Sequence, residues 1–528
     1  MASRESIRWP IIFVFPLLLP ALWSLIQSAA QTRSLDVNPI VGLLGTTLAL
    51  GIGSACLAVP CGWVLAIVLV RLGWPARLLL SLFLITLAFV PLAVQAGGWI
   101  SVIGPYGWIT PRDLGLGVSV RTGPAAAIAV MLIHALAFLP WVVGILAGSL
   151  AWHGIDIEEW ALTFTGLPNV LTRVLLPVHR DATILSAFVV LAGVWSDMTV
   201  TDLFAIRTLA EEIYVEMEAG SIGTQGLPVV LVSMLTGVGI SLLVSKAMVR
   251  ELDRPASVGF ASPWDVVGLA RSHSAIAIQL LGISIMVLLT LPLLALGRQG
   301  FASFYPSGWS TTGGWGDVRL IGSSLFISSA SGFVATLSAT VLAWWYINES
   351  RPRRAGAIMI AMFAMMIPGP AIGLAIVEML SRPSPGDLLG RFYDSALVII
   401  WGQAARAWPW VFLVLAGAMS RYPKCRWELL YLEGASSWMR FRLGPLGELW
   451  NIVAGGFVLG TALCLGELAT SKLIAPPGVE LVSTTMFSLL HVGTTQAQAR
   501  LGLMVWLVSA LMVIAGWGMQ RGKKKRQR

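Results

Sequence analysis

Long apolar stretches constrain this chain more than any other feature of its sequence. A helix needs about 20 apolar residues to cross the roughly 30 Å hydrocarbon core of a bilayer. Twelve such stretches lie near residues 10–29, 39–70, 79–99, 124–148, 183–204, 227–247, 275–297, 320–345, 356–380, 395–418, 449–471 and 499–518. Only 12% of the residues are charged, about half the share usual in soluble proteins, which excludes a set of soluble domains. The sequence therefore predicts an all-α polytopic membrane protein with about twelve transmembrane helices.

Lysine and arginine are unevenly distributed among the predicted loops. If both chain ends lie in the cytoplasm, the inner segments hold 24 of the 35 Lys and Arg residues, which is the positive-inside bias. We therefore predict a multi-pass plasma-membrane protein with both termini cytoplasmic. The net charge of +9 needs no nucleic-acid partner, because the basic tail favours contact with anionic lipid. Alternatively, the first apolar stretch is a signal peptide cleaved after residues 28–30, which would leave eleven spans.

The sequence contains an internal duplication. Residues 45–66 align without gaps with residues 322–343, and seven of the 22 aligned positions are identical. Pro91 and Pro368 keep the same offset of 277 residues, and a Pro-Trp-Val triplet recurs after a further helix at an offset of 269. Two similar half-bundles about an axis normal to the membrane, with a pathway between them, would give this pattern. A duplicated structural bundle without a pathway is the alternative.

The duplication sets the predicted domain boundaries. Residues 1–42 form a first helix and an outer loop, and residues 43–245 form the first copy of the repeated unit. Residues 246–319 contain a cytoplasmic linker, the seventh helix and an outer loop, and the second copy spans residues 320–516. A basic cytoplasmic tail, residues 517–528, completes the chain.

Two long inner loops lie at equivalent positions of the halves. They are IEEWALTFTGLPNVLTRVLLP (157–177) and WELLYLEGASSWMRFRLGP (427–445). Each has an acidic residue, apolar residues at helical spacing, a glycine, then ten residues and a proline. This pattern predicts a short amphipathic helix that the glycine ends, followed by a second segment. Such an apolar projection suits docking into a groove on another protein, and an interfacial helix lying on lipid is the alternative.

These two loops resemble the EAA loops of ATP-binding-cassette (ABC) importer permeases, in which Glu-Ala-Ala precedes a glycine and a distal Leu-Pro. Glu428 stands six residues before Gly434, as in that pattern, although leucines replace the alanines. In the first loop Glu159 is one residue early relative to Gly166, and Leu-Pro is retained at Pro177. Both loops are two residues short between glycine and proline.

The wider pattern is similar to fused two-half permeases of the ferric-iron and thiamine importer group, over about residues 43–245 and 320–516. The resemblance implies a type I transmembrane fold in a bacterial inner membrane, a ferric-iron or thiamine-like cargo and an extracytoplasmic binding protein. It also implies two copies of a separate ATPase subunit and no cofactor. The implied ATPase-docking positions are Glu159, Gly166, Pro177, Glu428, Gly434 and Pro445.

Three ionisable residues lie within predicted spans, where each costs about 2.5–3.5 kcal/mol on insertion scales. Arg406 lies in the middle of its span, and Asp197 and Glu467 occupy nearly equivalent places toward the outer end of theirs. They either line the translocation pathway or pair structurally, as Arg406 could with Glu467.

Catalytic and cofactor motifs are absent from the sequence. There is no GxxxxGK[ST] phosphate loop, no HExxH pair and no GxSxG motif, so we expect a transport permease and not an enzyme. The four cysteines show no metal-binding spacing. A secondary active transporter with two six-helix halves is the alternative function. It should carry coupling carboxylates deep in the bundle, whereas the predicted positions are shallow.

Overall fold

A computed structural model describes most of the chain. The described residues are 8–31, 37–104, 107–108, 123–152, 161, 164–219, 226–253, 273–302, 313–380, 388–421, 429–430, 432–493 and 495–526. Every regular element within these ranges is helical. Eight helices are long and apolar enough to cross a membrane, or up to twelve spans if each of four bent helix pairs counts as one. The prediction of an all-α multi-pass membrane protein is confirmed.

The described helices follow nearly the same order twice. Two helices precede the repeated sets, α1 (Arg8–Gln31) and α13 (His273–Ala302). The first set is α2 (Val37–Arg71), α3 (Trp74–Phe89), α4 (Leu92–Ile103), α5 (Gly123–Trp152), α7 (Leu167–Val170), the π-helical turn η2 (Leu171–Leu175), α8 (Leu176–Val178), α9 (Arg180–Ser196), α10 (Thr199–Leu203), α11 (Leu209–Glu218) and α12 (Gly226–Asp253). The second set is α14 (Gly313–Asn348), α15 (Arg351–Met365), α16 (Gly369–Leu380), α17 (Leu388–Tyr393), α18 (Ala396–Ser420), α20 (Ser437–Leu443), the π-helical turn η4 (Gly444–Glu448), α21 (Trp450–Gly466), α22 (Ala469–Ile474), α23 (Val482–Val492) and α24 (Thr495–Arg526). The two orders differ in that α17 occurs only in the second set and that α7 and α8 flank η2 where α20 alone precedes η4.

Equivalent hydrogen bonds show that the two sets fold alike. The backbone N–H of Leu209, at the start of α11, donates to Thr47 Oγ1 at 3.0 Å. The backbone N–H of Val482, at the start of α23, donates to Ser324 Oγ at 2.9 Å. Thr47 and Ser324 stand at the offset of 277 residues that the aligned segments share. Each hydroxyl therefore satisfies a donor that the helix start leaves without an intrahelical partner.

Four predicted spans are broken rather than continuous. The stretch near 79–99 bends by 101° between α3 and α4, and the stretch near 356–380 bends by 90° between α15 and α16. Pro91 and Pro368 lie at these breaks, because proline lacks an N–H donor and keeps the preceding residue out of the helical region. The stretches near 183–204 and 449–471 are interrupted after Ser196 and Gly466.

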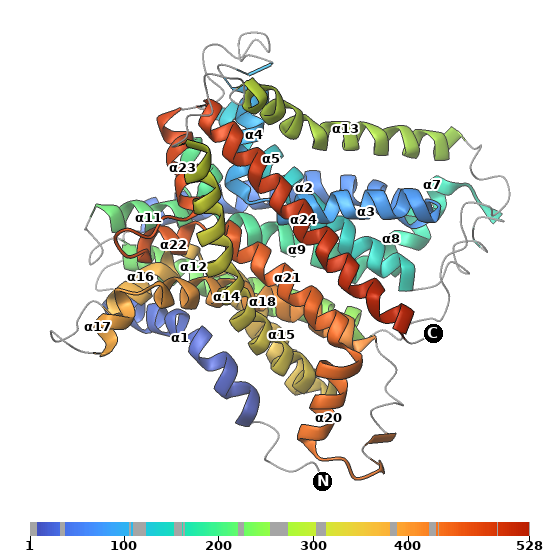
Figure 1. Ribbon diagram of the computed structural model, residues 1–528. Helices are drawn as coiled ribbons and strands as arrows, with labels where there is room; N and C mark the ends of the chain where they lie inside the picture. The colour runs from blue at the N-terminus through green and yellow to red at the C-terminus, as the bar shows by residue number, and fades with distance from the viewer. Residues whose placement is uncertain are drawn as a thin grey trace.

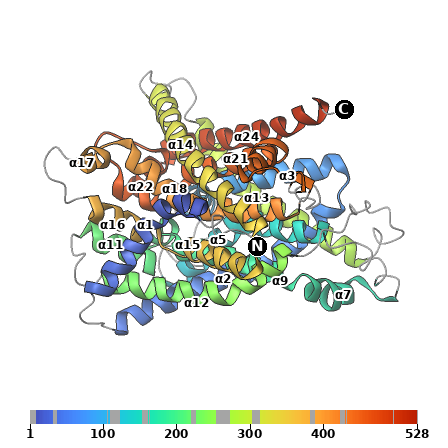
Figure 2. The ribbon, with the colours of Figure 1, turned by 90° about the horizontal axis from the view of Figure 1, so that it is seen from below.

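The helix that precedes each set packs on the opposite half. Helix α1 contacts α14, α16 and α18 besides α12 of its own half, and α13 contacts α2 and α4 besides α24 of its own half. The last helix of each half also crosses over, since α12 packs on α15 and α24 packs on α3. Figures 1 and 2 show α1 beside α16 and α18 in both views. These crossed contacts hold the two half-bundles together.

Helices α7 and α20, which follow α5 and α18 in the chain, lie toward the same side of the bundle as the start of α1 and the end of α24. Figure 1 shows these four at the right and lower side, with α11, α17 and α22 at the left. We call the first side the loop side and the second the α11 side. An even number of spans before each loop would place them together in this way.

Candidate translocation site and coupling loops

Each half places one carboxylate at a break in the chain, directly after α9 in the first half and directly after α21 in the second. These carboxylates belong to Asp197 and Glu467, respectively. The Asp197 carboxylate accepts backbone hydrogen bonds from Thr199 at 2.9 Å and from Val200 at 3.0 Å. Glu467 Oε1 accepts one from the backbone of Thr470 at 2.9 Å. The first N–H groups of a helix lack partners and favour negative charge. These carboxylates therefore satisfy backbone N–H groups in the first turns of α10 and α22, directly after the ends of α9 and α21.

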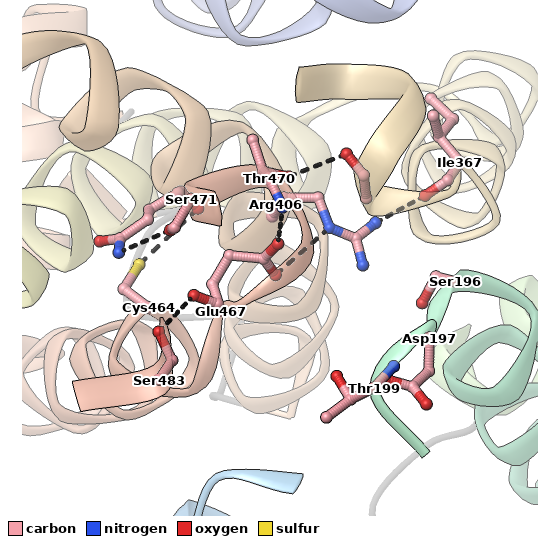
Figure 3. Close-up of polar contacts among 12 residues, drawn as sticks. Ser196, Asp197, Thr199, Ile367, Arg406, Cys464, Glu467, Thr470, Ser471 and Ser483 are labelled. Carbon is pink, nitrogen blue, oxygen red and sulfur yellow. Dashed lines mark hydrogen bonds and ion pairs between the residues drawn. The ribbon is translucent and has the colours of Figure 1, made fainter. Parts of the chain in front are cut away.

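Each carboxylate also meets a side chain from the long central helix of its own half. His134 of α5 lies with Nε2 3.1 Å from Asp197 Oδ2, and its Nδ1 donates to the Val130 carbonyl at 2.9 Å. Because both neighbours are acceptors, His134 and Asp197 share one proton along the Nε2–Oδ2 contact. In the other half, Arg406 Nε of α18 lies 3.5 Å from Glu467 Oε2. Figure 3 shows Arg406 between Glu467 and Ile367.

Arg406 has a second contact, which the other half makes with a different residue. Its Nη1 donates to the Ile367 carbonyl at 2.6 Å, at the break between α15 and α16. The equivalent carbonyl at the first break belongs to Val90, which accepts from Gln95 Nε2 at 3.0 Å. Gln95 Nε2 also donates to the Leu87 carbonyl at 3.1 Å. A broken helix leaves such carbonyls unpaired, so each half uses a side chain to satisfy them.

These groups line a cavity between the two halves. The cavity has a volume of about 160 Å³, and its wall includes Asp197, Arg406 and Glu467. The structure thus brings together all three ionisable residues that the sequence singled out, and it also pairs Arg406 with Glu467. The two halves do not contribute equally, because Ala137 stands in the first half where Arg406 stands in the second. Among the described residues, no group of three or more His, Cys, Asp or Glu side chains could hold a metal ion.

Sequence reasoning missed four residues of this site. His134 was only one of five scattered histidines, and Gln95 carried no signal because its role depends on a bend. Trp141 and Trp410, which also line the cavity, belonged to the repeated Pro-Trp-Val triplets. That repetition was the available signal, since equivalent residues on a pathway axis must face each other.

Two of the predicted docking positions, Glu159 and Glu428, lie outside the described residues. Gly434 is exposed and has a φ of 75°, a left-handed conformation that suits glycine. It ends the helical turn in which the Glu433 N–H donates to the Leu429 carbonyl. Gly166, in contrast, does not have a positive φ. It directly precedes α7.

A helical segment follows the glycine in both loops and leads to the predicted proline. Pro177 lies in α8 after η2 and is exposed, whereas Pro445 lies in η4 and is buried. Large apolar side chains beside these segments are open to the surroundings. Among them, Phe164 is 73% exposed and Trp438 is 67% exposed. Exposed apolar groups in a connecting loop are typical of a contact with another protein.

Comparison with known proteins gives two similar curated relatives. A scan against protein-family models matched none. The chain is 24% identical over 447 residues to the thiamine transport system permease protein ThiP of Escherichia coli K12, covering 80% of this chain and 78% of that protein. It is also 24% identical over 444 residues to the ThiP protein of Salmonella typhimurium LT2, with the same two coverages. Because the match spans four-fifths of the chain, it takes in both halves. The chain is a permease of the ABC-importer class.

This permease is a transport protein and not an enzyme, as the sequence predicted. It is a multi-pass protein of the plasma membrane. The structure and the relatives agree with a fused chain in which one polypeptide supplies both transmembrane halves. The secondary-transporter alternative has no support among the relatives.

Proposed function

We propose that this permease forms the translocation pathway of an importer for thiamine or a similar small organic cation. The observation that carries the proposal is the similarity to two thiamine transport system permeases over 80% of the chain. The names of these relatives favour thiamine over ferric iron, the other cargo expected from the sequence. In this proposal the pathway runs through the cavity, and Asp197, Arg406 and Glu467 face the cargo.

Transport is driven by two ATPase subunits that dock on the two loops. The docking positions are Glu159, Gly166, Pro177, Glu428, Gly434 and Pro445. The exposed side chains of Phe164 and Trp438 support this role, because each could fill an apolar groove on an ATPase. Closing of the ATPase pair would move both loops and rock the half-bundles, each consisting of residues 43–245 or 320–516. An extracytoplasmic binding protein delivers the cargo at the α11 side.

Uptake of radiolabelled thiamine tests the proposed function directly. Cells without a thiamine importer of their own would express the permease with its ATPase and binding protein. We expect thiamine accumulation that is lost when the phosphate-loop lysine of the ATPase is replaced, because that lysine holds the ATP phosphates. Uptake that persists with the inactive ATPase would contradict an ABC mechanism. Absence of thiamine uptake, with ATP hydrolysis intact, would contradict the proposed cargo.

Labelling of single cysteines tests the orientation. In a chain with its own cysteines replaced, Trp438→Cys on the loop side should react with a membrane-impermeant maleimide only from the cytoplasmic face. The matched control is Leu389→Cys in α17, which is 51% exposed at the α11 side and should react only from outside. The reverse pattern would place the loops where no ATPase could reach them.

A further inference from the structure

Two tryptophans, one from each half, meet in the wall of the cavity. Trp141 of α5 and Trp410 of α18 follow Pro140 and Pro409 in the repeated triplets. Their ring centroids are 5.4 Å apart and their planes are tilted by 58°. In a duplicated chain, equivalent residues touch each other only near the axis that relates the halves. The tryptophan pair therefore marks this axis at the level of the cavity.

Both indoles keep part of their surface open to the cavity. Both side chains are only partly buried and line the cavity. Within the described part of the chain, neither indole N–H makes a hydrogen bond, although Trp195 donates to Ser233 Oγ at 3.0 Å. A buried tryptophan N–H usually finds a partner. The ring faces and N–H groups of Trp141 and Trp410 are thus available to a molecule that enters the cavity.

The charges of the cavity do not favour an anion. Asp197 and Glu467 supply two carboxylates, and Arg406 supplies one fixed positive charge that Glu467 and the Ile367 carbonyl already contact. His134 shares a single proton with Asp197. With that proton on either atom, the formal charge of the four side chains is zero, so no net positive charge attracts an anion. The preference for positive charge comes from the negative faces of the two indoles.

From this combination we infer that Trp141 and Trp410 form a transit site for an aromatic organic cation, which stacks between the two indoles beside the paired carboxylates of Asp197 and Glu467. The inference rests on the proposed function, because it takes a thiamine-like cation as the cargo. An indole face attracts a cation within about 6 Å of the ring.

The tryptophan pair also closes the site in the present conformation. A cavity of about 160 Å³ is smaller than the roughly 300–1,000 Å³ of typical small-molecule sites. Since the two indoles contact each other, a ring can enter only if they separate by about one van der Waals spacing, roughly 3.5–4 Å. Rocking of the half-bundles would supply this separation, because α5 and α18 belong to different halves.

Binding of labelled thiamine to the full chain, assembled with its ATPase in lipid nanodiscs with and without ATP, tests the site without the binding protein. Trp141→Leu and Trp410→Leu should each raise the Kd for thiamine by roughly 3- to 30-fold, the range expected for loss of a cation–π contact. Trp141→Phe and Trp410→Phe should have smaller effects, because phenylalanine keeps a ring. Trp74→Leu is the matched control, since Trp74 is 63% exposed on α3 and does not line the cavity.

A second probe separates stacking from simple packing. Thiochrome, the uncharged tricyclic oxidation product of thiamine, should bind more weakly than thiamine to the parent protein, and this preference should shrink in both leucine variants. An unchanged Kd in both leucine variants that still assemble, or equal losses for leucine and phenylalanine, would overturn the transit site. Failure of the parent protein to bind thiamine in either state would also overturn it, even if whole-cell uptake succeeds. Absence of whole-cell thiamine uptake would instead refute the proposed function.

Discussion

Replacing Arg406 with methionine tests whether the arginine is held in place by structure or acts in transport. The change removes the contact with Glu467, whose side chain is 12% exposed, and the 2.6 Å hydrogen bond to the Ile367 carbonyl. Breaking one partner of a buried ion pair costs about 3–5 kcal/mol, and a hydrogen bond to a charged group contributes about 1.5–3 kcal/mol. Because Arg406 and Glu467 both border the cavity, we take the lower end of each range and expect Arg406→Met to lower the free energy of unfolding by about 4.5 kcal/mol.

A double-mutant cycle with Glu467→Gln separates the two contacts. Neutralising Glu467 removes the uncompensated carboxylate that Arg406→Met leaves behind, so the double variant should recover about 2–3 kcal/mol relative to Arg406→Met. The free energy of unfolding would be measured by denaturant titration in detergent micelles, and transport would be measured as thiamine uptake.

Three outcomes are informative. Recovery of stability without recovery of uptake, when Glu467→Gln alone retains uptake, indicates that Arg406 acts on the cargo in addition to its structural contacts. Recovery of both indicates that the arginine only positions α18 against the two helix breaks. A stability loss below about 1 kcal/mol for Arg406→Met, with strictly additive effects in the double variant, would refute the reasoning from the ion pair.

Three further predictions concern other parts of the chain. Gly434→Val should uncouple ATP hydrolysis from uptake, because a branched residue is strained by about 1–2 kcal/mol at a φ of 75°; Gly434→Asn should be tolerated, and equal uptake in both variants would contradict the docking role. Gly332→Leu should prevent folding, because a Cβ at this position would lie 2.5 Å from the Thr461 backbone nitrogen. The monodisperse fraction in detergent measures folding, and Gly322→Leu on the same helix, with nothing within 4 Å of the Cβ that leucine adds, is the control. Burial, followed by nearby carboxylates, raises the pKa of Glu211 in α11 to about 7, so the parent protein should lose stability between about pH 4.5 and 7, where its unfolded state ionises first. Glu211→Gln should show a smaller loss, because Asp202 and Glu212 also have raised pKa values. Parallel stability curves of the two proteins over this range would contradict the shift.

Several features of the fold followed from the sequence because they depend on composition or on repetition. The apolar stretches are long enough to require helices in a bilayer, where every backbone group must be satisfied internally. The two halves could be aligned because Pro91 and Pro368, and the two Pro-Trp-Val triplets, keep nearly constant offsets. The approximate position of Asp197, Arg406 and Glu467 also followed, since ionisable residues within apolar stretches are costly.

The sequence could not show where the helices bend or on which half of the bundle each helix packs. Hydropathy measures only the average polarity of a segment, so it runs through the 101° bend at Pro91 and through the carboxylate caps of α10 and α22. The crossing of α1 and α13 onto opposite halves, and the contact between Trp141 and Trp410, are long-range packing relations. Local sequence therefore determined that this chain spans a membrane as two related halves. Only tertiary structure decided that Arg406, Glu467, His134 and Asp197 converge on one cavity, because side chains more than 60 residues apart become neighbours only when helix faces pack.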